Sequence, residues 1–129
     1  METKTSFVVT IDGPAGSGKT VCGRLAALKL GFEFISSGLY YRAVTFLALH
    51  TKIPLSDEDR LAGLAEKICV QFRNEPKGLT VLVNGEDLTE ELKKREVTEC
   101  VKYAAEAQKV RKAVNSVIRS YSRAKRVIA

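Results

Sequence analysis

The chain has 129 residues, 45% of them apolar and 28% charged, which is typical of one soluble globular domain. Its net charge of +6 comes from residues 107–129, which hold seven basic and no acidic side chains, whereas residues 1–106 hold 14 basic and 15 acidic ones. The three cysteines lack C-x-x-C spacing, which argues against a disulfide framework and a zinc site. No apolar run could span a bilayer and no signal-peptide pattern is present, so the sequence argues against a membrane protein. These features indicate a cytoplasmic location.

The first elements predict a βαβ unit. Residues 7–11 are β-branched and apolar without polar alternation, as in a strand that is buried on both faces of a parallel sheet. Residues 19–30 show helical spacing and end before Gly31, which suits a C-terminal helix cap. Residues 32–35 then form a second short strand. A strand, a glycine-rich turn, a helix and another strand together make up this unit.

Between the first strand and the helix, residues 13–20 match the pattern G-x-x-x-x-G-K-[ST] in full. Glycines let successive backbone N–H groups turn toward one anion, and the following helix adds its positive end and further N–H groups. The lysine of this pattern reaches the β- and γ-phosphates, and the hydroxyl after it ligates Mg²⁺. We therefore predict ATP binding by Gly13, Pro14, Ala15, Gly16, Ser17, Gly18, Lys19, Thr20 and Val21, with Thr20 as the metal ligand.

A second motif, Ser36–Arg42, follows the second strand and opens a helix that we predict over residues 39–50. It brings a hydroxyl, a flexible glycine, an aromatic ring and an arginine together within a short stretch. A guanidinium can hold a phosphate through two hydrogen bonds, and a neighbouring ring can pack against a sugar or a base. The alternative interpretation is a solvated Arg42 beside two tyrosines of the core.

The middle of the chain predicts a small antiparallel piece. Ser56 and Asp59 resemble a capping box that opens a helix. Residues 70–73 and 79–83 form strands on either side of a turn, and Asn84-Gly85 after them is a strong hairpin signal. We interpret this piece as an insertion and not as part of the main sheet.

Two further helices and a strand are predicted in the remainder. Helical spacing runs from Leu92 to Ala104 and, more clearly, from Val110 to Tyr121. The last helix is basic, but no aromatic platform accompanies it, and its apolar residues form a core stripe. We interpret it as a solvated face with one substrate-binding arginine, so that nucleic-acid binding is not the expected function. Residues 127–129 begin another buried strand.

Together, the two motifs resemble those of the bacterial cytidylate kinase family. Residues 10–19 are similar to its opening signature and Ser36–Arg42 to its second signature. Residues 109–112 are similar to the family's V-R motif on a long helix. The resemblance covers essentially the whole chain, but only the first half or so of a family member.

This resemblance implies an α/β fold, with an incomplete phosphate-loop nucleoside-monophosphate kinase domain over residues 1–129 that lacks the C-terminal strands and the lid. The fold would have a parallel sheet and a small antiparallel insert for the substrate over about residues 52–105. The resemblance further implies transfer of the γ-phosphoryl group of ATP to CMP or dCMP, with Mg²⁺ as cofactor. Lys19 would be catalytic, the monophosphate site would be lined by Ser37, Gly38, Tyr41 and Arg42, and Arg111 would reach the acceptor phosphate.

The family pattern sets further expectations. A serine that helps to read cytosine in the family falls at Lys102, so we expect weaker base selectivity. The family's sheet order places residues 126–129 between the other two strands and leaves residues 7–11 at an edge, where self-association can occur. Because the family's Asp-Gly-Arg segment and arginine-rich lid would follow Ala129, we expect the chain by itself to be nearly inactive. The open alternatives are a nucleotide-binding module without catalysis, a different nucleoside-monophosphate kinase and a basic nucleic-acid-binding module.

Overall fold

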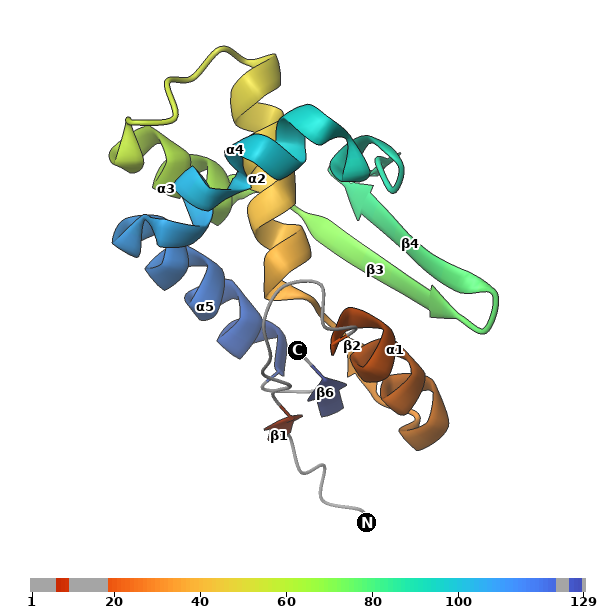
Figure 1. Cartoon of the computed structure of the whole chain (residues 1–129). Coiled ribbons are helices and arrows are strands. Elements are labelled where there is room, and N and C mark those ends of the chain that lie inside the picture. The colour runs from red at the N-terminus through yellow and green to blue at the C-terminus, as the bar shows by residue number, and fades with distance from the viewer. Residues whose placement is uncertain (1–6, 10–18, 123–125, 129) are drawn as a thin grey trace.

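The computed structural model describes residues 7–9, 19–122 and 126–128, and these form two separate three-stranded sheets and five α-helices (Figure 1). The first sheet is parallel and consists of β1 (Phe7–Val9), β6 (Arg126–Ile128) and β2 (Glu33–Phe34), in the order β1-β6-β2. Strand β6 pairs with both neighbours, so the last strand lies in the middle and β1 lies at an edge. This is the order that the family resemblance implies.

Helix α1 (Lys19–Leu30) follows the predicted phosphate loop and ends as the sequence predicts. Gly31 has φ of +70°, a left-handed conformation that favours glycine. The N–H of Phe32 donates to the carbonyl of Ala27 at 2.9 Å, which closes the last helical turn. The chain then enters β2 directly, so α1 and the parallel sheet are held close together.

Helix α2 (Ser37–His50) begins two residues earlier than expected, because Ser36 caps it. The Oγ of Ser36 accepts a hydrogen bond from the N–H of Leu39 at 3.2 Å. Helix α3 (Glu58–Lys67) differs from the prediction, because its cap is not Ser56. Asp57 takes that position, and its carboxylate accepts from the N–H of Arg60 at 3.2 Å. A carboxylate also suits the positive end of a helix, which a serine cannot complement by charge.

The second sheet is antiparallel and confirms the predicted hairpins. It is formed by β3 (Val70–Glu75), β4 (Gly78–Val83) and β5 (Glu86–Asp87), in that order. The turn between β4 and β5 has φ of +51° at Asn84 and +86° at Gly85, as a two-residue hairpin turn requires. This sheet shares no strand with the parallel sheet, in agreement with its interpretation as an insertion.

The next helical segment departs from the expected continuous helix. A 3₁₀ turn, η1 (Glu91–Lys93), comes first, Lys94 is extended, and α4 (Arg95–Glu106) begins after it. Leu92 and Val97 are both fully buried. Five residues apart on a continuous α-helix, they would point about 140° away from each other. The break at Lys94 lets both side chains enter the core.

Helix α5 (Gln108–Ser122) starts after the single residue Ala107, and α3 fixes its beginning. The Glu58 carboxylate of α3 accepts from the N–H of Lys109 at 2.8 Å, and the Lys109 ammonium pairs with Asp59. The buried side chains of α5 are those of the predicted apolar stripe, among them Val110, Val114 and Ile118.

The main core lies among the helices, with α2 in the middle and α3, α4 and α5 packed around it (Figure 1). Ala43, Val44 and Ala48 of α2 have no exposed surface. A second, smaller cluster joins Ala27 of α1 to Phe34 of β2. Among the described helices, none is long and apolar enough to cross a membrane.

Candidate active site

The structure brings together two predicted substrate residues that are 70 positions apart, Tyr41 on α2 and Arg111 on α5. Burial raises the pKa of the Tyr41 phenol above its ordinary value, while the charge of the Arg111 guanidinium and a hydrogen bond with it act in the opposite direction. The Arg111 guanidinium therefore lies near the Tyr41 phenol. An exposed cation beside a half-buried hydroxyl is a suitable arrangement for binding a phosphate or a sugar hydroxyl.

Packing of the two helices places this pair. Val44 of α2 and Val110 and Val114 of α5 are all fully buried in the same core cluster. Neighbouring residues on a helix point about 100° apart. Arg111, next to the buried Val110, therefore lies at the edge of the interface between α2 and α5, where it is exposed. Packing of these valines thus determines the position of Arg111 relative to Tyr41.

Arg42, the last residue of the second motif, contacts η1 and α4. Its Nη1 donates to the carbonyl of Leu92 and to the hydroxyl of Thr98, both at 2.9 Å. Because the chain is extended at Lys94, the Leu92 carbonyl is free to accept a hydrogen bond from a side chain. Arg42 is therefore held in a defined position between α2 and the start of α4.

The first turn of α2 carries the other two predicted residues. Ser37 is half-buried and Gly38 is exposed. A Cβ on Gly38 would meet only the Oγ of Ser36, at an ordinary contact distance of 3.6 Å. The fold itself therefore does not require glycine at position 38.

A basic hollow of about 570 Å³ lies along the exposed side of α5 and includes Arg111. Four of its lining side chains are basic and one is acidic, so it favours an anion. The lining residues are Glu106, Gln108, Lys109, Arg111, Lys112, Asn115 and Arg119.

The predicted ATP-binding residues are described only in part. Gly13, Pro14, Ala15, Gly16, Ser17 and Gly18 lie outside the described residues. Lys19, Thr20 and Val21 form the start of α1, which gives their place on the helix. The parallel strand before them and the helix after them are both present, as this type of loop requires.

Comparison with known proteins identifies the family. The family profile described as cytidylate kinase matches residues 9–129. The chain is 41% identical over 103 residues to the cytidylate kinase of Bacillus velezensis, covering 80% of this chain and 46% of that protein. It is 41% identical over 107 residues to the enzyme of Vibrio cholerae (83% and 48%) and 36% identical over 124 residues to that of Shewanella piezotolerans (95% and 54%). The chain belongs to the cytidylate kinase family. It spans about half the length of the curated relatives it matches.

Several contacts around Tyr41, Arg42 and Arg111 were not predicted from the sequence of this cytidylate kinase family member. Thr98 and the Leu92 carbonyl were not predicted as partners of Arg42. The ammonium of Lys102 lies 5.3 Å from the centre of the Tyr103 ring, which was not predicted either. No sequence pattern marks a single threonine or carbonyl as the partner of an arginine some 50 residues away.

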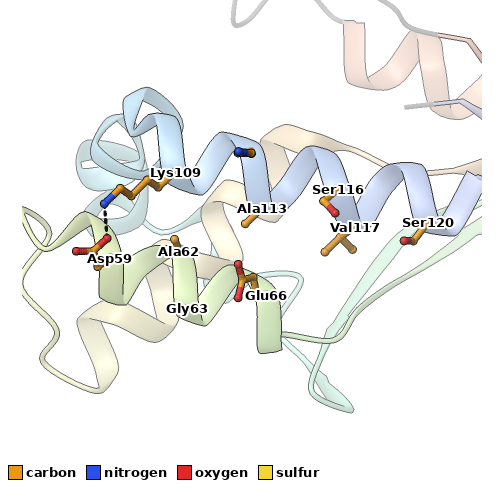
Figure 2. Close-up of a pocket in the computed structure, with 10 residues that line it drawn as sticks. Asp59, Ala62, Gly63, Glu66, Lys109, Ala113, Ser116, Val117 and Ser120 are labelled. Atoms are coloured by element: carbon orange, nitrogen blue, oxygen red, sulfur yellow. Dashed lines mark hydrogen bonds and ion pairs between the residues drawn. The ribbon is translucent and has the colours of Figure 1, made fainter.

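A second hollow, of about 740 Å³, lies between α3 and α5 (Figure 2). The ion pair between Asp59 and Lys109 closes one end of it. Small side chains line its floor, including Ala62, Gly63 and Ala113. Of the predicted substrate residues, Arg111 lines the basic hollow, and none lines this second one.

Among the described residues, no three His, Cys, Asp or Glu side chains gather into a metal-binding group. The ligand that the sequence predicts for Mg²⁺ is the hydroxyl of Thr20, the second residue of α1. One protein hydroxyl fits Mg²⁺, which keeps several waters and is otherwise held by substrate phosphates.

Proposed function

We propose that this protein transfers the γ-phosphoryl group of ATP to CMP or dCMP, giving ADP and CDP or dCDP. The observation that carries the proposal is the pairing of Tyr41 with Arg111 beside a basic hollow, in a chain of the cytidylate kinase family. The acceptor phosphate would lie against Arg111, and its ribose and base would face the first turns of α2.

The residues of α2 would position the acceptor. Gly38 leaves the first turn of the helix open, so a ligand could approach the backbone there. Arg42 is already fixed by Leu92 and Thr98, and this lowers the entropy that it would lose on contacting the ligand. Ser37 would add a hydroxyl donor at the same end of the helix.

ATP would bind at the start of α1. The backbone N–H groups of residues 13–18 and the N-terminus of the helix would hold the phosphates, with the Lys19 ammonium on the transferred group. Thr20 would hold Mg²⁺, which when bound neutralises charge on the phosphates. Phosphoryl transfer needs little covalent participation by the protein, so alignment and charge neutralisation by these residues would supply most of the rate acceleration.

Titration calorimetry with CMP, dCMP, UMP and AMP tests the acceptor, and titration with ATP and Mg²⁺ tests the donor. We expect CMP or dCMP to bind more tightly than AMP, and Lys19→Ala to abolish ATP binding because it removes the fixed positive charge of the loop. Lys29→Ala is the matched control, since Lys29 is an exposed basic residue in the last turn of the same helix. Equal affinity for all monophosphates, or unchanged ATP affinity in Lys19→Ala, would contradict the proposal.

A further inference from the structure

A hydrogen-bonded tie joins helix α1 to the tip of the β3–β4 hairpin. The Nη1 of Arg24 donates to the backbone carbonyl of Glu75 at 2.8 Å and approaches the Asn74 side-chain oxygen at 3.4 Å. In return, the Asn74 amide nitrogen donates to the backbone carbonyl of Arg24 at 2.9 Å. The bonds run in both directions between residues 50 positions apart, so they fix the orientation as well as the distance of the two elements.

The hairpin spans two hydrophobic clusters. At its base, Val70, Val81 and Val83 belong to the main helical core. Leu79 packs against both the main core and the small cluster of α1 and β2. The Phe72 ring, on the strand paired with Val81, meets the Phe34 ring edge-on, with centroids 6.4 Å apart. Figure 1 shows the hairpin leaving the helices and reaching toward α1. It therefore connects the helix of the phosphate loop with the helices of the insert.

The tie lies close to the predicted ATP site. Lys19 and Thr20 are the first residues of α1, and Arg24 follows on the same helix, little more than one turn later. A helix transmits a shift of one end to the next turn because its hydrogen bonds keep it rigid. A change in the position of α1 on ATP binding would therefore reach the hairpin through Arg24 and Asn74.

We propose that Arg24 and Asn74 are positioning residues that couple occupancy of the phosphate loop to the placement of the insert, so that ATP and the acceptor monophosphate increase each other's affinity. This inference rests on the proposed function. Coupling of this kind requires that each ligand favours the same arrangement of two elements. The tie supplies a contact through which α1 and the hairpin would move as one unit.

The test is the dissociation constant of CMP, measured by calorimetry with and without a non-hydrolysable ATP analogue and Mg²⁺. In the unmodified protein we expect the analogue to tighten CMP binding by about 5-fold or more, the lower end of typical couplings. Arg24→Gln and Asn74→Leu should each reduce this ratio to below about 2, with each ligand alone still binding. Each substitution leaves one bond in place, since Asn74 can still donate to the backbone carbonyl of residue 24 and Arg24 to that of Glu75. The double variant should therefore reduce the ratio at least as far as either single variant.

The controls separate the tie from general effects on α1 and the hairpin. Lys29→Gln removes a positive charge from the same helix, and Glu75→Gln changes a side chain whose backbone carbonyl is the acceptor, so both should keep the full ratio. Arg24→Lys keeps one donor and should restore part of it. Thermal melts followed by circular dichroism show whether each variant is folded.

The results distinguish this inference from the proposed function. If the unmodified protein binds CMP and ATP but the ratio is near 1, or if Arg24→Gln and Asn74→Leu retain the full ratio, the coupling role is wrong and the kinase proposal stands. If the unmodified protein binds neither nucleotide, the proposed function is wrong and the inference falls with it. A loss of the ratio in both variants, with both controls intact, supports the tie as the coupling element.

Discussion

Replacing Thr98 by valine tests whether the insert prepares Arg42 for the acceptor. The Thr98 hydroxyl accepts one of the two hydrogen bonds from Arg42 Nη1, and the Leu92 carbonyl accepts the other. Valine has nearly the same shape as threonine and a similar helix propensity, so Thr98→Val removes the hydroxyl and little else. Thr98 is exposed on α4, so we expect almost no change in the free energy of unfolding.

The expected loss is in affinity. An arginine that is not held beforehand must be ordered when the ligand binds, which costs about 0.5–1.5 kcal/mol for a rotamer-rich side chain, or roughly 2- to 12-fold in the dissociation constant. The bond to the Leu92 carbonyl remains in the variant and keeps part of the order. We therefore expect Thr98→Val to weaken CMP binding by about 2- to 5-fold, in the lower part of that range.

The assay is calorimetric titration of CMP into the unmodified protein, Thr98→Val and Thr98→Ser. Serine keeps the hydroxyl, so Thr98→Ser should bind CMP as the unmodified protein does. Unchanged affinity in Thr98→Val would show that the contact plays no part in binding. Tighter binding would show that Thr98 withholds Arg42 from the ligand, and either result would refute preorganisation.

Four further predictions concern stability. Gly85→Ala should lower the free energy of unfolding by about 1–2 kcal/mol, because Gly85 has φ of +86°. Gly63→Ala should raise it by about 0.5–1 kcal/mol, because glycine destabilises the interior of a helix such as α3 relative to alanine. Urea denaturation measures both changes. Leu92→Ala should cost about 2–5 kcal/mol, since Leu92 is fully buried, and an unchanged midpoint and slope would contradict the assigned core. Burial raises the folded-state pKa of Tyr41, so the native state holds its proton more firmly than the unfolded state. The unmodified protein should therefore lose stability as the pH rises above about 10, and this loss should be smaller in Tyr41→Phe.

Local sequence signals accounted for most of the elements. Gly31 ends α1, and the Asn84-Gly85 turn joins β4 to β5, because each depends on the conformational preference of one or two residues. The cap of α3 was misplaced by one residue, since serine and aspartate are both good caps and only the geometry chooses between them. The break at Lys94 was missed because it depends on two buried side chains that must enter the same core.

The site was foreseen to a different degree at each residue. The family resemblance pointed to Tyr41 and Arg111, and their proximity follows once α2 and α5 pack through their apolar stripes. The partners of Arg42 and Arg24 could not be predicted from spacing. Thr98, Leu92 and Asn74 lie about 50 residues away in the sequence, and nothing in the local pattern distinguishes them from other polar or carbonyl groups.

Thr98 and Arg111, which contact the second motif, lie on one helical unit, and this constrains how the proposed acceptor site can change. Ala107 is the C-terminal cap of α4, and its carbonyl also accepts from the N–H of Arg111 at 3.0 Å in the first turn of α5. Thr98 on α4 and Arg111 on α5 are thus joined through a one-residue junction. Tyr41 and Arg42 are adjacent on α2 and point about 100° apart, one toward each of these helices. A displacement of the α4–α5 unit relative to α2 would therefore alter both contacts at once, so the two halves of the proposed acceptor site would change together.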